Sequence, residues 1–238
     1  MKTNYANILF TLCTFTASFT FSSCKKECTG ESNRTYPLTG FTCIDAGDQH
    51  RFSIARGDHF SIQASGCTDD INDLSVEVVN QQLQIRYPEF KRWHDGVTFF
   101  ITMPVLKGAK FSGQSKATIT GFADTTNKVF DLSGQSACSY YGHSATDVIS
   151  VSGQSEFILQ GVALNLQINV SGQSRYSGYG VLVNQSTNVL ASGQSEAYVY
   201  TNGAFTASAS GQSSIYYKGS PSFKNFSCSG QSKISWQP

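Results

Sequence analysis

The chain has 238 residues, 39% of them hydrophobic, and its 17 Lys and Arg against 16 Asp and Glu give a formal net charge of +1. This balance provides no basic surface for nucleic acid or for an anionic membrane, while the apolar content suffices for a folded core. The four histidines are scattered and no Cys or His pair has zinc-ligand spacing, so we expect neither a metal nor a cofactor.

Residues 1–23 have the features of an export signal. The apolar stretch after Lys2 is too short to span a bilayer, and two serines precede Cys24. Small residues before a cysteine resemble the bacterial lipoprotein box, whose cysteine is lipidated and becomes the mature N-terminus. The charged residues 25–27 are similar to signals that direct some Bacteroidetes lipoproteins to the outer surface. We therefore expect a lipid on Cys24, a linker over residues 24–34, and a lipid-anchored protein of the outer membrane or cell surface.

Three cysteines lie outside both the signal and the repeats described below: Cys28, Cys43 and Cys67. An exported protein meets an oxidising environment, in which disulfides persist. We expect a disulfide between Cys43 and Cys67, while the sequence itself leaves open which of the three cysteines are paired.

Residues 35–108 predict a β-rich N-terminal region. Short runs of alternating apolar and polar residues are separated by turn residues, and no helix longer than one turn is expected. The loop 88–96 carries Lys91, Arg92 and Trp93, which either contact a ligand or belong to an ordinary exposed loop. The expected strands cover 51–54, 59–64, 74–79, 82–87 and 97–104.

From residue 109 onward the chain is repetitive. The tetrapeptide Ser-Gly-Gln-Ser occurs seven times, with start-to-start spacings of 18 to 21 residues. Such a period is typical of a solenoid, in which each unit buries its apolar face against its neighbours. The copies occupy 112–115, 133–136, 152–155, 171–174, 192–195, 210–213 and 229–232.

Apolar residues occupy fixed places around each tetrapeptide: the first and third positions before it, and the second and fourth after it. Mostly polar positions lie between them, which is the alternation of a strand with one buried face. Cys138 and Cys228 fall in these inward columns, so we expect both to be buried small hydrophobes rather than reactive thiols.

The repeats therefore predict an all-β fold, a right-handed parallel β-helix of about 19-residue coils over 109–238, with the irregular β region 35–108 stacked on it. Neither the leucine-rich pattern nor the calcium-binding nonapeptide is present. Ser-Gly-Gln-Ser is expected to form the corner of each coil, with glutamine and serine ladders running between coils. A ligand-binding array is the alternative interpretation.

One pair of carboxylates deserves comparison with polysaccharide-cleaving enzymes. Glu156 and Glu196 occupy the same outward column two coils apart, roughly 9.6 Å from the strand spacing, which is near the upper end for an inverting glycosidase. Arg175 fills that column between them. A Glu-Arg-Glu ladder would hold both carboxylates ionised and leave no general acid, so we expect no catalytic residues.

Outward columns also collect tyrosines. A rigid face of tyrosines suits sugar rings or a protein partner, because each ring offers apolar area and a polar hydroxyl. The alternative is that tyrosine serves only as a good strand residue. The candidate binding face comprises Tyr141, Tyr179, Tyr198, Tyr200 and Tyr216.

Several segments resemble a known family. Phe52-Ser53-Ile54, Leu83-Gln84-Ile85 and Phe100-Ile101-Thr102-Met103-Pro104, followed by repeated Ser-Gly turns, are similar to the autotransporter adhesin head GIN domain family of Bacteroidetes. The resemblance covers roughly residues 40–225. It implies a β-helical fold on a secreted or lipid-anchored protein with an adhesive role, and it supplies no catalytic residues.

We therefore expect a non-enzymatic lipoprotein of the cell envelope. Its partners would be the membrane, through the lipid, and a glycan or an extracellular protein, through one face of the β-helix. The alternatives are a structural envelope or matrix component without a specific ligand and, third, a polysaccharide-acting enzyme.

Overall fold

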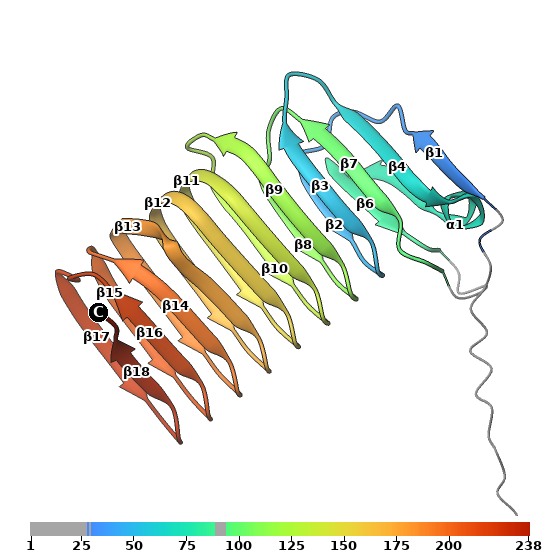
Figure 1. Ribbon diagram of the computed structural model, residues 1–238. Coiled ribbons are helices and arrows are strands. Elements are labelled where there is room, and N and C mark those ends of the chain that lie inside the picture. The colour runs from blue at the N-terminus through green and yellow to red at the C-terminus, as the bar shows by residue number, and fades with distance from the viewer. Residues whose placement is uncertain (1–27, 29, 89–93) are drawn as a thin grey trace, which may run out of the picture.

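The computed structural model describes residues 28, 30–88 and 94–238. It is a β-solenoid whose coils stack in a row from the N-terminal region to the C-terminal coil (Figure 1). The repeats form β8 (Gly108–Phe111), β9 (Lys116–Ala123), β10 (Lys128–Leu132), β11 (Ala137–Val151), β12 (Glu156–Val170), β13 (Arg175–Ala191), β14 (Glu196–Thr201), β15 (Ala204–Ala209), β16 (Ser214–Lys218), β17 (Phe223–Cys228) and β18 (Lys233–Trp236).

Parallel pairing between successive coils confirms the predicted β-helix. On one side, β9, β11, β12, β13, β14, β16 and β18 pair in that order; on the other, β8, β10, β11, β12, β13, β15 and β17 do so. Cys138, for example, lies opposite Phe157, which is one repeat further along. The strands β11, β12 and β13 are long because each continues from one side of the coil to the other.

The Ser-Gly-Gln-Ser corners have the structural role expected of them. Gly153 has a φ of +76°, and a Cβ at this position would lie 2.5 Å from the carbonyl oxygen of Gly134 in the preceding coil. Only glycine accommodates both conditions. Between coils, the Gln154 backbone N–H donates to the Gly134 carbonyl at 2.7 Å, and its side-chain amide donates to Gln173 at 2.9 Å. The same amide ladder links Gln135, Gln154, Gln173, Gln194, Gln212 and Gln231.

The inward columns form the core in the first six coils, where their apolar side chains are buried, Cys138 among them at 2% exposed. The prediction is wrong for the seventh coil. Cys228 is exposed, and Phe226 and Trp236 are 38% and 56% exposed. These residues lie opposite Ala209, Ala207 and Tyr217 of the inward columns, but their coil packs against a neighbour on one side only.

The N-terminal region continues the solenoid, with its strands out of chain order. Because β2 pairs with both β6 and β8, and β3 with both β7 and β9, the β2–β3 coil lies between two others. Beyond β6 and β7 the pairing becomes antiparallel, through β5, β4 and β1. The elements are β1 (Glu31–Thr35), β2 (Cys43–Ala46), β3 (Arg51–Arg56), β4 (Ser61–Cys67), α1 (Thr68–Asp73), β5 (Ser75–Val79), β6 (Gln82–Arg86) and β7 (Thr98–Met103).

The helix α1 corrects the expectation that no helix exceeds one turn. Two aspartates in its first turn favour a helix N-terminus. Ile71 is 1% exposed and joins the core, and Arg34 donates to its carbonyl at 3.1 Å. Six residues thus suffice for a helix because tertiary contacts hold it at both ends.

The expected Cys43–Cys67 disulfide is also wrong: Cys67 is bonded to Cys28. The antiparallel pairing of β1 with β4 places Glu31 opposite Cys67 and brings Cys28 within a Cα–Cα distance of 5.6 Å. Cys43 lies on β2, opposite Gln82 and Gly108, and is free. The bridge therefore fastens the segment before β1 to the end of the solenoid.

Some predictions fall outside the described residues. These are the signal 1–23, the lipidation site Cys24, and the loop residues Lys91, Arg92 and Trp93. Within residues 28, 30–88 and 94–238, no helix has the length and apolarity to cross a membrane. That same part of the chain contains no group of His, Cys, Asp or Glu placed to hold a metal ion.

Candidate functional site

Two columns of outward side chains run side by side along one face of the solenoid. We call them outer column one and outer column two; they are the first and third positions after each corner, continued onto β3 and β7. Outer column one comprises Thr98, Arg51, Lys116, Ala137, Glu156, Arg175, Glu196, Ser214 and Lys233. Outer column two comprises Phe100, Ser53, Thr118, Ser139, Ile158, Ser177, Tyr198, Tyr216 and Ser235.

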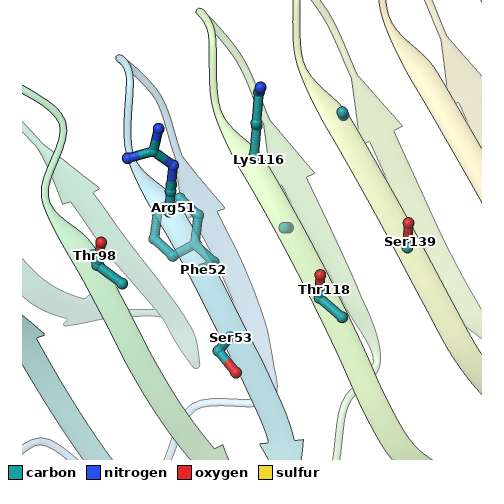
Figure 2. Close-up of a pocket in the computed structure, with 9 residues that line it drawn as sticks. Arg51, Phe52, Ser53, Thr98, Lys116, Thr118 and Ser139 are labelled. Atoms are coloured by element: carbon teal, nitrogen blue, oxygen red, sulfur yellow. The ribbon is translucent and has the colours of Figure 1, made fainter.

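A shallow hollow of about 380 Å³ lies at the N-terminal end of this face. Phe52 is among its lining residues, and Arg51 and Lys116 extend in the same direction from the neighbouring strands β3 and β9 (Figure 2). Hydroxyl groups line the rest of the hollow. They belong to Ser53, Thr98, Thr118 and Ser139.

The two cations of the hollow are adjacent, and neither forms an ion pair with the described residues. Arg51 and Lys116 are directly opposite each other in the β3–β9 register, and both are exposed. Within the described part of the chain, no carboxylate lies within 4.0 Å of either side chain. The hollow therefore offers two positive groups and several hydroxyls to a ligand.

At the C-terminal end of the face, three tyrosines form a continuous series of ring contacts, which we call the tyrosine ladder. Tyr198 stacks on Tyr216 with ring centroids 5.0 Å apart, and its other neighbour Tyr179 meets it edge to face at 5.4 Å. Such pairs hold one another in place beyond simple burial of area. The structure thus brings Tyr179, Tyr198 and Tyr216 together, each half-buried, on the outer side of the sheet.

Each ring of the tyrosine ladder also has a cation over it. The Lys218 Nζ lies 4.8 Å from the Tyr179 centroid, and the Lys233 Nζ lies 4.9 Å from that of Tyr216. The guanidinium carbon of Arg175 lies 5.9 Å from the Tyr198 centroid. Cation–π contacts of this kind fix the rings and place positive charge beside them.

Tyr179 enters the ladder through an irregularity in the sheet. Three residues of β13, 179–181, have no counterpart on β14, because Gly178 pairs with Val199 and Leu182 with Tyr200. The Tyr179 hydroxyl is buried without a hydrogen-bond partner among the described residues, and burial, reinforced by Tyr198 and Tyr216, raises its pKa to about 12.

The other two predicted tyrosines do not join the ladder. Tyr141 is 39% exposed and shares a column with Gln160 and Gly180 rather than with the ladder tyrosines. Tyr200 lies opposite Leu182 and Lys218, in the next column. The sequence pattern thus predicts five outward tyrosines, and the structure brings three of them together.

The Glu156–Arg175–Glu196 column has the order predicted from the repeats. Arg175 donates to Glu196 at 2.7 Å, and the Tyr198 hydroxyl donates to the same carboxylate oxygen at 3.2 Å. Burial of its ring and the nearby Glu196 raise the pKa of Tyr198. Glu196 is therefore an acceptor that orients Arg175 and Tyr198.

A buried ion pair lies at the opposite turn of the coil. Lys128 is fully buried, and its ammonium donates to the Asp124 carboxylate at 2.8 Å and to the carbonyls of Thr126 and His143 at 3.1 and 3.0 Å. All three N–H groups are thus satisfied. Partial burial acts to raise the pKa of Asp124, but the hydrogen bonds from Lys128 and Thr126 outweigh that effect. The pKa of Asp124 is therefore lowered.

Asp147, opposite Lys128 on the next coil, is less well satisfied. It is 1% exposed; one carboxylate oxygen accepts from Ser144 at 2.6 Å, and the other has no partner among the described residues. Burial raises its pKa to about 6, against the opposing effects of Ser144 and Lys128. We assign this cluster a structural role, because Lys128 and Asp147 are both buried and Lys128 donates to Asp124 and to two backbone carbonyls.

The fold and the exposed face define the class: a β-solenoid that presents an aromatic and cationic surface. A family model described as "Putative auto-transporter adhesin, head GIN domain" matches residues 40–221. The chain belongs to this family. No curated protein sequence matches the chain closely enough to add to this assignment.

Solved structures share the fold at low sequence identity. A putative adhesin from Bacteroides fragilis superposes with a TM-score of 0.77 at 18% identity, covering 88% of this chain and 98% of that one. A protein from Parabacteroides distasonis, described as a putative lipid binding protein, gives 0.69 at 16% identity, covering 88% and 98%. A putative adhesin from Parabacteroides merdae gives 0.68 at 15% identity, covering 88% and 97%.

Sequence reasoning missed the hollow. Arg51 and Lys116 are 65 positions apart, and no repeat motif connects the first with the second. The available signal was the alternation of 51–54, which marks Arg51 as outward, but its neighbour follows only from the out-of-order stacking of β3 on β9.

Proposed function

We propose that this protein is a non-enzymatic adhesin of the cell envelope, which binds a glycan or an extracellular protein through the tyrosine ladder. The observation that carries the proposal is the series Tyr179–Tyr198–Tyr216, outward-facing and held by ring contacts and cations. Pre-ordered aromatic side chains bind with little loss of conformational entropy, and they commonly dominate binding energy. Membership of an adhesin family supports the same function.

The test is binding of the full chain to glycans, to matrix proteins and to cells. A Tyr198→Ala/Tyr216→Ala variant should lose binding by roughly tenfold or more, because it removes two stacked anchors. Its melting temperature should change little, since both side chains lie outside the core.

The matched control is Tyr141→Ala/Tyr200→Ala, which removes two outward tyrosines that lie outside the ladder. Unchanged binding by this control would attribute the loss to the ladder. If the ladder variant binds as wild type does, the proposed surface is wrong.

We further propose that a lipid on Cys24 anchors the protein in the outer membrane, with the solenoid directed away from it. The motif before Cys24 supports this anchor, and the Cys28–Cys67 bridge would fasten the anchored segment to one end of the solenoid. Cys24→Ala should move the protein from the membrane fraction to the soluble fraction of the cell. Unchanged membrane partitioning would contradict the anchor.

A further inference from the structure

We infer that the ligand of this face is an acidic glycan, a polyuronate chain that lies across the strands from the hollow to the tyrosine ladder. The inference rests on the proposed function and specifies the ligand's chemistry and direction. Its first basis is continuity: the hollow and Tyr198–Tyr216 occupy the same two outer columns, linked strand by strand.

The charge of the face supports an anionic ligand. The face and its border carry five cations and two carboxylates. Two of the cations, Arg51 and Lys116, have no acidic partner within the described part of the chain. The whole chain has an excess of only one cation. Positive charge is therefore concentrated where the ladder and the hollow lie. The cations are Arg51, Lys116, Arg175, Lys218 and Lys233, and the carboxylates are Glu156 and Glu196.

The chemistry of the two ends fits a carboxylated sugar. Arg51 presents a planar fork that matches a carboxylate, and Lys116 supplies a second cation one strand away. Hydroxyls of Ser53, Thr118 and Ser139 lie beside them, where sugar hydroxyls can exchange hydrogen bonds. At the other end, Tyr198 and Tyr216 stack on each other and have cations over their faces, so the ladder offers a sugar its apolar ring edges and the adjacent positive charges.

The dimensions require an extended polymer. From Arg51 on β3 to Tyr216 on β16 there are six strand spacings, or roughly 29 Å at about 4.8 Å each. One pyranose unit of an extended glycan covers a distance similar to one strand spacing, so about six units would reach both ends. Between the ends the path follows outer column two, over Ser139, Ile158 and Ser177, with Glu156 and Arg175 beside it in outer column one.

The experiment compares two hexasaccharides, β-1,4-linked mannuronate and β-1,4-linked mannose, which differ only in carboxylate versus hydroxymethyl groups. The full chain should bind the mannuronate hexamer roughly tenfold or more tightly, and salt should weaken that preference. A mannuronate trimer, too short to reach both ends, should bind more weakly than the hexamer.

Variants separate this inference from the proposed function. Arg51→Gln/Lys116→Gln should remove most of the preference for mannuronate, because it should lower mannuronate-hexamer affinity much more than mannose-hexamer affinity. Lys107→Gln/Lys110→Gln makes the same change in net charge at exposed lysines on or beside β8, on the other side of the coil, and should bind as wild type does. Tyr198→Ala/Tyr216→Ala should weaken both glycans.

The opposing outcomes are equally distinct. Equal affinity for both hexamers, or no binding of either, would overturn the acidic-glycan inference; in both cases the cell and matrix-protein assays still decide the proposed function. A single-stranded oligodeoxynucleotide that binds as tightly as the mannuronate hexamer would also overturn it, because the face would then attract polyanions in general.

Discussion

At the scale of single residues, Asp147 links the stability of the fold to pH. Its pKa lies at about 6 in the folded chain, against an ordinary value of 3.8. A carboxyl group whose folded pKa is raised binds its proton more tightly in the folded state, so its contribution to stability falls as pH rises from 3.8 through about 6. Above this range the loss is on the order of 3 kcal/mol.

We therefore expect Asp147→Asn to raise the free energy of unfolding near pH 7 by up to about 3 kcal/mol, and by much less near pH 4. Lys128 keeps its three acceptors, Asp124 and the carbonyls of Thr126 and His143, in this variant. Urea titrations of both proteins at both pH values measure the difference. The quantity to compare is the difference in stability between variant and wild type at each pH. Either protein alone also responds to His50, because burial lowers its pKa to about 4 and this contribution to stability is lost as pH falls. An equal difference at both pH values would contradict the prediction.

Thiol reactivity at two positions reports the packing of individual coils. Cys138 is 2% exposed, and burial raises the pKa of its thiol, so it should remain unlabelled by a maleimide in native buffer. Cys228 is exposed and should react rapidly under the same conditions. Mass spectrometry after brief labelling assigns each site, and a denatured sample shows that both thiols are competent. Protection of Cys228 in the native chain would show that the seventh coil is covered.

At the scale of one element, replacing a glycine of the Ser-Gly-Gln-Ser corner has two energetic costs: a backbone conformation with positive φ and a steric clash with the preceding coil. Gly153 and Gly40 have the same φ of +76°, but a Cβ on Gly153 would lie 2.5 Å from the Gly134 carbonyl, whereas nothing lies within 4 Å of one on Gly40. Gly40→Ala should therefore lower the free energy of unfolding by only the cost of the positive-φ conformation, about 1–2 kcal/mol. Gly153→Ala should lose more, because the corner must shift against the preceding coil. Equal losses in urea unfolding would show that the coils separate easily.

The elements also show what the sequence could and could not predict. Equivalents of Val151 and Gly153 recur at the same positions in each repeat. The β-helix, its inward columns and the outward direction of Tyr198 therefore follow from the periodicity alone. The contact of Tyr179 with Tyr198 depends on three extra residues in β13, which no period predicts. Pairings between distant segments, such as Cys28 with Cys67 and β3 with β9, were inaccessible because local pattern carries no information on long-range stacking.

At the scale of the whole molecule, stability should vary along the solenoid axis, because each coil contacts only its neighbours. The strands β11, β12 and β13 are the longest and pair on both sides, while β17 and β18 pair on one side and β17 is exposed along its length. Amide hydrogens of β11–β13 should therefore exchange more slowly than those of β17 and β18, by at least about tenfold.

A substitution in the last coil tests whether this gradient arises from nearest-neighbour packing. Phe226→Ala removes ring contacts with Phe205 and Tyr217 at 5.0 and 5.6 Å. It should speed exchange in β15 to β18 and leave β11 and β12 unchanged, because opening the last coil does not require opening the middle ones. Hydrogen exchange read by mass spectrometry over peptides from each coil makes the comparison. Faster exchange throughout the chain would mean that the solenoid opens as one cooperative unit, and the coil-by-coil description of its stability would then be wrong.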